Sequence, residues 1–513
     1  LTPADLIYEV KRRCESRNIT YKGLRRFQED LSNIRGNCIA IAPTGSGKTE
    51  ASILWALTNI EDMGYAKIIY LLPTMATANS MWRRLADLFG SDNVGLAHSS
   101  AHLYFNNEEE VNEYVTGSVA ERNMLFDRAF IRPVTVATVD QLLNTGYHAK
   151  NWTIKETNAM NSVIILDEIH AYDGWTMGLI IKTIAYMSRF GTRFLLMSAT
   201  MPQYIIDLFS CYLKGCKLVQ DKELLELTRS KYYFDERIIQ DAYSDIIDAV
   251  ESGKKVLVVV NTVGLCQQIA SDLKNYNPIC YHSRFIQKDR KAIEKKLEEA
   301  RFVIATQIVE VSLDIDYDWL FTECAPPDAI AQRAGRINRY RDNKRDSRVI
   351  IFRPSEKSEE LYNPIEDPNL LSRTIDLFQN VNGDAINEQK LLDIINEVYD
   401  DFHIEAFDSY QEAIKMYEKG QKARLFVLDN SNDDNKDEKT RLEKYSTISV
   451  IPFRFYDEAL KANPADRAML EVKIPYWYFI KHQKVRDGLA FCDLLYDEFL
   501  GARLEQDKSS LCL

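Results

Sequence analysis

The stretch from Ala42 to Thr49, which reads APTGSGKT, constrains the fold of this chain more than any other. It comes directly after the apolar run 38–41 and ahead of the segment 51–57, in which apolar residues recur with helical spacing. Strand, glycine-rich loop and helix in this order are typical of a phosphate-binding loop. Gly45 and Gly47 let backbone N–H groups turn toward phosphate oxygens, and the dipole of the following helix favours an anion. A glycine-rich turn that only caps a helix is the alternative, which the flanking elements disfavour.

The side chains of this loop predict ATP and Mg²⁺ as cofactors. Lys48 is expected to reach the β- and γ-phosphates, and Thr49 to offer its hydroxyl to Mg²⁺ at the helix N-terminus. The residues expected to contact the nucleotide here are Thr44, Gly45, Ser46, Gly47, Lys48 and Thr49.

A second motif follows the apolar run 163–166 and reads Asp167-Glu168-Ile169-His170. Side chains alternate along a strand, but at its end a turn can bring both carboxylates toward the phosphates. Asp167 would then hold Mg²⁺, and Glu168 would polarise the water that attacks the γ-phosphate. An acidic turn without a catalytic role is the alternative. Together with the phosphate loop, the motif predicts hydrolysis of a nucleoside triphosphate.

Length and composition limit the class of protein. A chain of 513 residues exceeds what one core supports. It has no apolar window of about 18 residues, and its first residues are polar and charged, so we expect a cytoplasmic protein without a membrane partner. Nine cysteines without a CxxC pair indicate reduced thiols. The net charge of −12 does not exclude nucleic acid bound in a local groove.

Two series of strand-like apolar runs predict an α/β fold with two parallel sheets. The runs end in polar loops and alternate with helical patterns, which places ligand contacts at the carboxyl ends of the strands. Only the first series contains a phosphate loop. Besides 38–41 and 163–166, the runs are 66–72, 94–99, 134–138 and 193–197 in the first series, and 255–260, 302–306 and 319–322 in the second.

Two further segments carry candidate site residues. Gln28 precedes the phosphate loop by about one helix and can read an adenine edge by paired hydrogen bonds. The cluster from Gln332 to Arg339 contains Arg336 and Arg339, which are three apart, so we predict that they share a helix face and reach the γ-phosphate. A basic surface turn is the alternative for the cluster.

The last part of the chain is predicted to be mainly helical. Asp429 to Asp437 is rich in Asn and Asp and indicates an exposed loop. The aromatic stretch 474–481 would stack on single-stranded bases or, as is commoner, form core. The predicted domains are 1–215, 216–355 and 356–513, the last with a mobile acidic loop near 429–440.

These motifs, in this order, resemble those of the superfamily 2 helicases and translocases over roughly residues 20–345. The resemblance implies two tandem RecA-like lobes with a C-terminal accessory domain. It implies that Gln28 contacts adenine, and that Lys48, Thr49, Asp167 and Glu168 perform the hydrolysis. Gln332 would lie near the γ-phosphate, and Arg336 and Arg339 would act as arginine fingers. The further motifs that carry the resemblance are Pro73-Thr74, Thr138, Ser198-Ala199-Thr200 and the segment Thr306–Asp314, which places Asp314 at the nucleotide.

A finer resemblance is to the helicase of type I CRISPR interference. It implies movement on single-stranded DNA, in the 3′→5′ direction, together with a CRISPR surveillance complex. The family commonly carries an HD-type nuclease domain, but no His-Asp dipeptide occurs in this sequence, so we expect the nuclease to be a separate polypeptide. The stretches that carry this resemblance are 138–141, 167–173, 308–316 and 496–501.

Three alternatives stay open at this point. The first is a superfamily 2 helicase that acts on RNA or in DNA repair, because ATPase motifs do not report recognition of the 2′-OH. The second is an ATP-gated clamp that holds nucleic acid and recruits a nuclease without translocation. The third is a P-loop kinase, which the second lobe and the arginine cluster disfavour.

Overall fold

The structure is a computed structural model, and its contacts divide the chain into two compact units. One unit comprises Leu1–Leu225 with Asp401–Leu442, and the other Glu226–Asp400 with Glu443–Leu513. The described residues are 1–16, 21–99, 101, 125–147, 152–310, 315–342, 344–362, 367–423, 440, 447–486 and 488–504.

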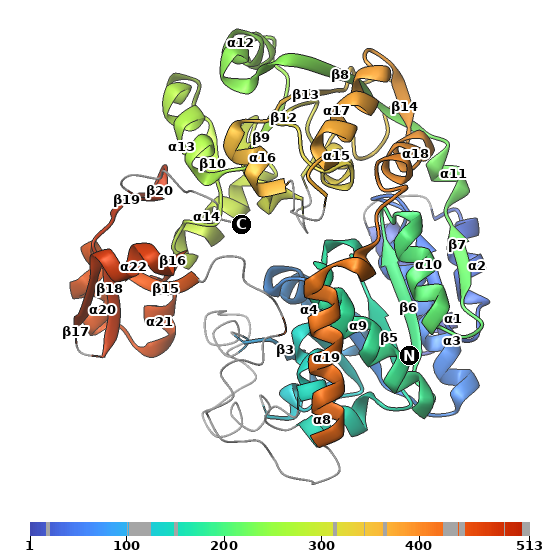
Figure 1. The fold of residues 1–513 in the computed structure, drawn as a ribbon. Coiled ribbons are helices and arrows are strands. Elements are labelled where there is room, and N and C mark those ends of the chain that lie inside the picture. Colours follow the sequence, from blue (N-terminus) through green and yellow to red (C-terminus); the bar gives the residue numbers. More distant parts are fainter. Residues whose placement is uncertain are drawn as a thin grey trace. The chain divides into compact units, whose positions relative to one another are not determined.

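The first unit is built on a seven-stranded sheet in the order β3-β4-β2-β5-β6-β1-β7 (Figure 1). Every pair of neighbours is parallel, which confirms the predicted first lobe. Edge strand β7 was not predicted, because only one of its residues is buried and its apolar signal is weak. The strands are β1 (Cys38–Ile41), β2 (Ile68–Leu72), β3 (Val94–Ala97), β4 (Val134–Thr138), β5 (Val163–Leu166), β6 (Arg193–Ser198) and β7 (Lys217–Gln220).

The helices of the first unit include one, α19, that comes from the C-terminal part of the chain. It packs on α9 so closely that a Cβ on Gly178 would lie 2.9 Å from the carbonyl oxygen of Tyr410. Lys182 also pairs with Glu418 at 2.6 Å. The longer helices are α1 (Pro3–Ser16), α2 (Arg26–Ser32), α3 (Lys48–Met63), α4 (Met75–Phe89), α8 (Trp152–Ala159), α9 (Gly174–Met187), α10 (Gln203–Tyr212) and α19 (Asp408–Ala423), with short α7 (Asp140–Leu143) and α11 (Lys222–Leu225).

The second unit holds another seven-stranded sheet, in the order β10-β11-β9-β12-β13-β8-β14. It is parallel except for β14, which pairs antiparallel with β8. The sheet confirms the predicted second lobe, although β8, β13 and β14 were not predicted. The strands are β8 (Thr228–Ile238), β9 (Val256–Val259), β10 (Ile279–Tyr281), β11 (Phe302–Ala305), β12 (Trp319–Glu323), β13 (Arg348–Arg353) and β14 (Ala385–Asn387).

The helices of this second sheet include the amphipathic pair α17 and α18, which lie in the part of the chain predicted to be mainly helical. Tyr232 of β8 stacks on Phe378 of α17, with ring centroids 6.1 Å apart, so the pair shares the core of this unit. The helices are α12 (Tyr243–Glu251), α13 (Val263–Asp272), α14 (Gln287–Leu297), α15 (Pro327–Ala334), α16 (Glu356–Tyr362), α17 (Leu370–Asn380) and α18 (Glu388–Val398).

The chain from Thr447 onward forms a small four-stranded sheet and a hairpin, whose core also includes Ile286. Within the aromatic stretch, Tyr478 and Phe479 are buried, whereas Tyr476 is 45% exposed, so the stretch is largely core. The elements are β15 (Thr447–Pro452), β16 (Val472–Pro475), β17 (Gln483–Arg486), β18 (Leu489–Cys492), β19 (Leu495–Asp497), β20 (Gly501–Arg503), α20 (Tyr456–Lys461), α21 (Pro464–Ala468) and α22 (Tyr476–His482).

The units do not coincide with the three domains predicted from sequence. Strand β7 extends the first sheet beyond 215, and the segment 401–442 returns to the first unit. The acidic loop near 429–440 lies outside the described residues except for Thr440, which donates to Asp140 at 2.8 Å. The assignment of separate roles to 1–215, 216–355 and 356–513 stays a prediction.

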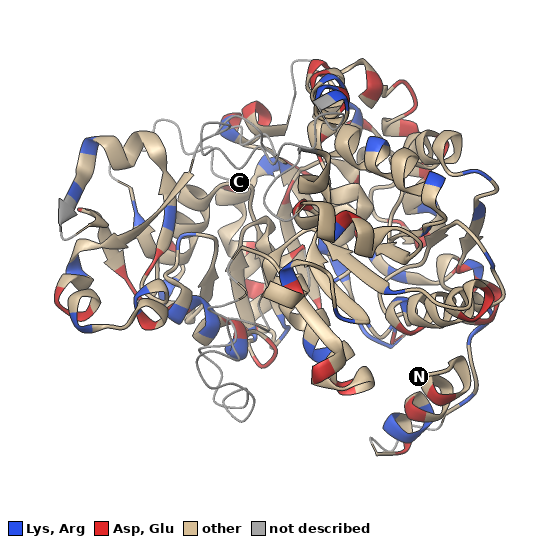
Figure 2. Ribbon diagram, turned by 90° about the horizontal axis from the view of Figure 1, so that it is seen from below, with Lys and Arg blue, Asp and Glu red and all other residues tan. Residues whose placement is uncertain are grey.

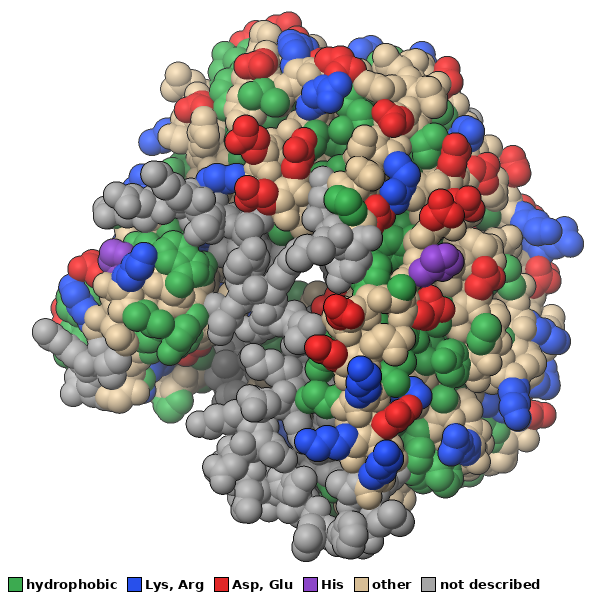
Figure 3. All heavy atoms as spheres, in the orientation of Figure 1, with side chains coloured by type: hydrophobic (Ala, Val, Ile, Leu, Met, Phe, Trp, Pro, Cys, Tyr) green, Lys and Arg blue, Asp and Glu red, His purple; other side chains and the backbone are tan. Residues whose placement is uncertain are grey.

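Charged residues of both signs are interspersed along the described ribbon (Figure 2). In α1, for example, Glu9 pairs with Arg12 and Arg13. On the face shown in Figure 3, hydrophobic side chains are scattered among charged ones. Among the helices of the described residues, none has the length and apolar character that a membrane span requires.

Side chains from the second sheet and its helices form hydrogen bonds with the C-terminal hairpin. Gln267 donates through Nε2 to the carbonyls of Leu500 and Ala502, at 2.6 and 3.0 Å. His282 lies with Nε2 3.0 Å from the same Leu500 carbonyl, while its Nδ1 accepts from the backbone N–H of Arg284. Burial lowers the pKa of His282 to about 3, and the charge of Arg284 adds to the effect.

We expect acidification to destabilise this unit through His282. Because the pKa of the imidazole is lower in the folded chain than its ordinary 6.5, only the unfolded chain binds a proton as the pH falls. The contribution of His282 to the free energy of unfolding is complete above about pH 6.5, and it is lower by ~2 kcal/mol at about pH 5. Melting temperatures near pH 7.5 and pH 5 test this. The melting temperature of His282→Gln, whose amide can make both hydrogen bonds, should fall less on acidification than that of the unchanged chain. An equal fall in both would contradict the assignment of the pH dependence to His282.

Candidate active site

The phosphate loop joins β1 to α3 through two glycines in the left-handed region, with φ of 84° at Gly45 and 80° at Gly47. A Cβ at Gly47 would lie 2.5 Å from Nε2 of Gln28, and the left-handed φ of Gly47 is what favours glycine there. Gln28 donates to the Gly47 carbonyl at 3.3 Å and accepts from the backbone of Arg25. The structure therefore places Gln28 directly against the loop.

Arg25 is a loop contact that the sequence analysis missed. Its Nη1 donates to the carbonyl oxygen of Gly45 at 3.0 Å, which turns this carbonyl toward the arginine. The sequence offered only its position three residues before Gln28 as a signal. Arg25 and Gln28 together tie α2 to both glycines.

The loop fits a bound phosphate group. Ser46 is 1% exposed, and its hydroxyl has no hydrogen-bond partner among the described residues. A buried hydroxyl without a partner costs free energy, so an anion that accepts from it would stabilise the loop. Lys48 begins α3, where the helix dipole also favours an anion.

The structure brings Lys48, Asp167 and Glu168 together. Lys48 Nζ lies 3.5 Å from Glu168 Oε1. Glu168 has a φ of 55°, and this left-handed backbone ends the strand alternation, so that Lys48 lies near both carboxylates. The turn proposed from the sequence is therefore present at the carboxyl end of β5.

Asp167 is buried and is held by two donors. Tyr70 donates from its hydroxyl to Oδ2 at 2.9 Å, and the backbone N–H of Glu168 donates to Oδ1 at 3.0 Å. Burial, and after it the charge of Glu168, raise the pKa of Asp167 to about 6, against the opposing charge of Lys48. A divalent cation would offset the cost of two adjacent carboxylates, so the donor set fits Mg²⁺.

Thr49, the other expected magnesium ligand, accepts a hydrogen bond from Arg84. The distance from Arg84 Nη1 to Thr49 Oγ1 is 3.1 Å, and Arg84 also pairs with Glu50. Arg84 belongs to α4, whose N-terminus is capped by Thr74 of the predicted Pro73-Thr74 contact. Neither Tyr70 nor Arg84 was predicted, because each is distant in sequence from the residue that it holds.

A hydrogen-bond relay connects the acidic motif to the end of β6. His170 Nδ1 lies 2.5 Å from the hydroxyl of Ser198, and this hydroxyl donates to the carbonyl of Thr200. Since a serine hydroxyl has one proton, Nδ1 of His170 must be the donor. His170 also lies 3.6 Å from Glu168. The relay connects the predicted Ser198-Ala199-Thr200 motif to the carboxylate expected to act on water.

We predict that Tyr70→Phe raises the Mg²⁺ concentration needed for half-maximal nucleotide binding about tenfold or more, because removing a partner of a metal ligand typically has an effect of this size. Binding of the nucleotide in excess EDTA should be unchanged. Tyr186→Phe is the matched control, since Tyr186 also donates to a buried carboxylate, that of Glu156. Equal Mg²⁺ dependence in both variants would show that Tyr70 does not position Asp167.

In the second unit, the predicted arrangement of Arg336 and Arg339 on one helix face is wrong. Helix α15 ends at Ala334, and the chain then turns, with Asn338 in the left-handed region at a φ of 45°. Three-residue spacing places side chains on one face only while the helix continues. Both arginines therefore lie in the turn that follows α15.

The turn places the predicted residues as follows. Arg336 is 6% exposed and donates to the carbonyls of Val309 and Glu310, at 3.0 and 2.6 Å. Arg339 is half-buried, and its backbone N–H donates to Asp316 at 2.9 Å. Gln332 is half-buried on α15. Asp314 lies outside the described residues.

Arg333, one residue beyond Gln332, is fully buried and forms hydrogen bonds with several residues of the second lobe. Its guanidinium donates to Glu310 at 2.7 Å, to Thr322 at 2.8 Å and to the side chain of Asn261 at 2.8 Å. Because these partners come from the ends of different strands, Arg333 joins α15 to the sheet. The sequence analysis did not separate this arginine from its neighbours in the cluster.

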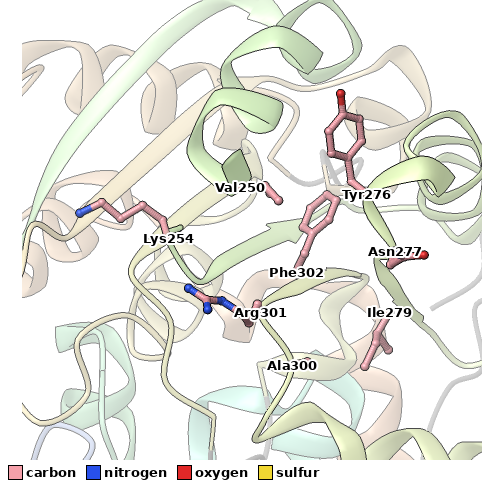
Figure 4. Close-up of a pocket in the computed structure, with 8 residues that line it drawn as sticks. All are labelled: Val250, Lys254, Tyr276, Asn277, Ile279, Ala300, Arg301 and Phe302. Carbon is pink, nitrogen blue, oxygen red and sulfur yellow. The ribbon is translucent and has the colours of Figure 1, made fainter. Parts of the chain in front are cut away.

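A pocket of about 360 Å³ lies at the amino ends of β9, β10 and β11 (Figure 4). In this view Phe302 lies between Val250 and Tyr276. None of the predicted site residues is among its lining residues. These are Val250, Lys254, Tyr276, Asn277, Ile279, Ala300, Arg301 and Phe302.

Two family models match separate parts of this chain. Residues 26–208 match the DEAD/DEAH box helicase family, and residues 252–342 match the C-terminal part of the CRISPR-associated nuclease/helicase Cas3 family. A protein of Methanocaldococcus jannaschii assigned to the Cas3 nuclease/helicases is 28% identical over 498 residues, which cover 90% of this chain and 66% of that protein. The chain thus spans just under two thirds of this relative.

Solved structures show the same fold. The AMPPNP complex of Cas3 from T. fusca has a TM-score of 0.74 at 17% identity, covering 98% of this chain and 72% of that one. A chain of a CRISPR RNA-guided surveillance complex in a pre-nicking state has a TM-score of 0.61 at 18% identity, covering 93% and 69%. From its motifs, its two parallel-sheet lobes and these similarities, the chain belongs to the Cas3-type CRISPR-associated helicases of the DEAD/DEAH group.

Proposed function

We propose that the chain is an ATP-dependent helicase that translocates on single-stranded DNA, in the 3′→5′ direction, during type I CRISPR interference. The observation that carries the proposal is the convergence of Lys48, Asp167 and Glu168 beside a phosphate loop. The surveillance complex and a separate HD nuclease are the proposed partners, supported by family membership and by the sequence resemblance.

The residues of the first unit have distinct parts in the proposed hydrolysis. ATP with Mg²⁺ supplies the phosphoryl group and the charge that offsets its negative oxygens. Lys48 binds the β- and γ-phosphates, while Thr49 and Asp167 hold the cation. Glu168 orients the attacking water and accepts its proton. Gln28 is proposed to read the base, and its hydrogen bond to the Gly47 carbonyl supports this role by holding it beside the loop.

In the second unit, Arg336 and Arg339 are proposed to stabilise the charge that develops on the γ-phosphate, with Gln332 beside them. A guanidinium suits this part because it is always charged and presents several donors in a fixed plane. Asp314 is proposed to contact the nucleotide as well. These assignments rest on the motif order.

The relay from His170 through Ser198 to Thr200 supports coupling of hydrolysis to movement. His170 Nδ1 donates to Ser198 at the end of β6 and lies 3.6 Å from Glu168 Oε2, beyond hydrogen-bonding distance. We propose that the polar ends of the strands grip the sugar-phosphate backbone of DNA. Loss of the γ-phosphate would then change the contacts with DNA through a movement of His170.

Strand displacement on a forked duplex tests this proposal against the clamp alternative. ATP-dependent release of the labelled strand from a fork with a 3′ single-stranded arm is expected, with no release by Lys48→Ala. ATP hydrolysis without release from any fork would favour the clamp. Faster release from an RNA fork than from a DNA fork would favour an RNA helicase.

A further inference from the structure

The turn that carries Arg336 and Arg339 has two residues in the left-handed region, Asn338 with a φ of 45° and Arg341 with a φ of 55°. Asparagine adopts this region more readily than most residues, whereas arginine rarely does. Such a turn persists only where surrounding contacts determine it. Asn338 makes one set of these contacts, and Glu388 makes the other.

Asn338 fixes the course of the turn through both its side chain and its backbone. Its side-chain amide donates to the carbonyls of Arg229 and Asp342, each at 3.1 Å, and its side-chain oxygen accepts from the backbone of Asp342 at 2.8 Å. The backbone N–H of Asn338 donates to the carbonyl of Tyr317 at 3.0 Å. The turn is thereby attached to β8 through Arg229.

The second set of contacts is made by Glu388, which lies between Arg229 and Arg341. Its Oε1 is 2.6 Å from Arg229 Nη2 and 3.6 Å from Arg341 Nη2. The three side chains are between 5% and 15% exposed. A Cβ on Gly335 would lie 3.6 Å from Arg229 Nη1, so this guanidinium lies against the start of the turn. Loss of Glu388 would remove an anion that these two buried guanidinium groups share.

Helix α18 contacts the arginine segment at both ends. Glu388 is its first residue and reaches the turn after α15. Tyr399, which follows its last residue, donates to Asp328 in the first turn of α15 at 2.7 Å. Because α18 is a rigid helix, these contacts fix the start of α15 relative to the turn that follows it.

We propose that Glu388 is a positioning residue for the arginine fingers, and that α18 acts as a brace that holds their turn in its left-handed conformation. The inference rests on the proposed function, because it gives Glu388 an effect on hydrolysis through Arg336 and Arg339. Glu388 contacts neither reactant. It acts by fixing where the two guanidinium groups can reach.

The first test is the steady-state kinetics of Glu388→Gln in the full chain. We expect kcat for ATP to fall about tenfold or more, as misplacement of a catalytic group does, with KM and nucleotide affinity nearly unchanged. Asp367→Asn is the matched control, since Asp367 also holds an arginine of these helices, Arg373, at 2.6 Å but does not contact the turn. It should hydrolyse ATP at the rate of the unchanged chain.

A double-mutant cycle distinguishes positioning from a general loss of structure. If Glu388 acts through Arg336, then adding Glu388→Gln to Arg336→Ala should reduce kcat little further. A full additional reduction would mean that Glu388 acts independently of the finger and would overturn the proposal. Should Glu388→Gln melt at a lower temperature than Asp367→Asn, Arg341→Gln takes its place in the cycle, because it leaves the 2.6 Å pair with Arg229 intact.

The outcomes separate this inference from the proposed function. No ATP hydrolysis by the unchanged chain, or an unaltered rate in Arg336→Ala, would contradict the proposed function itself. A low kcat in Arg336→Ala, together with a kcat in Glu388→Gln equal to that of Asp367→Asn, would contradict only the proposal that Glu388 positions the arginine fingers.

Discussion

Replacing Glu168 by Gln is expected to abolish ATP turnover and to leave nucleotide binding intact. Gln cannot accept the proton of the attacking water, and loss of a general base typically slows a reaction about 10²–10⁴-fold. The contact between Lys48 and Glu168 also weakens, which leaves the lysine available to phosphate. Steady-state hydrolysis and equilibrium binding of a fluorescent ATP analogue measure the two effects separately.

The matched control for this variant is Glu156→Gln. Glu156 is a buried carboxylate of the same unit that accepts a hydrogen bond from Tyr186 at 2.8 Å, which the amide oxygen of Gln can still accept. It should hydrolyse ATP at nearly the unchanged rate. Substantial turnover in Glu168→Gln would mean that another group accepts the proton.

Arg336→Ala is expected to lower the hydrolysis rate by about a hundredfold or more, in the range known for arginine fingers, and to leave nucleotide affinity nearly intact. The guanidinium is held by the carbonyls of Val309 and Glu310, so its direction is defined before nucleotide binds. Rapid-quench measurement of a single turnover reports the chemical step directly.

Arg348→Ala is the control for the loss of an arginine from this unit. Arg348 stacks on Trp319, with its guanidinium carbon 4.1 Å from the ring centroid, and it is not a predicted site residue. A single-turnover rate for Arg336→Ala equal to that for Arg348→Ala would assign the arginine cluster to a structural part of the lobe.

The parts of the fold that could be predicted are those whose signal is local. The phosphate loop, the strand that ends at Asp167 and the parallel sheet of each lobe follow from apolar runs that end in polar residues. Helices α17 and α18 follow from their apolar spacing. In each case a few consecutive residues determine both the element and the direction of its polar end.

The parts that could not be predicted depend on contacts between distant residues. Tyr70 reads as an ordinary strand residue until Asp167, 97 positions later, is placed beside it. Edge strands β7 and β14 carry little apolar signal, since each has one fully buried residue. The return of α19 to the first unit depends on Gly178, whose missing side chain matters only once Tyr410 lies against it.

The error at the arginine cluster has a specific cause. Spacing of three residues is informative only within a helix, and α15 ends at Ala334, before Arg336. Gly335 does not mark this end as a left-handed cap, because its φ is −57°. Glu388, which holds the resulting turn, comes from a helix more than forty residues further on.

The most direct test of the account is steady-state ATP hydrolysis by the purified chain with no nucleic acid, single-stranded DNA, duplex DNA or single-stranded RNA, with Lys48→Ala as the blank. The proposed function predicts strong stimulation by single-stranded DNA and weak stimulation by RNA, with no hydrolysis by Lys48→Ala under any condition. Hydrolysis that no nucleic acid stimulates, or that only RNA stimulates, would contradict a helicase that moves on single-stranded DNA.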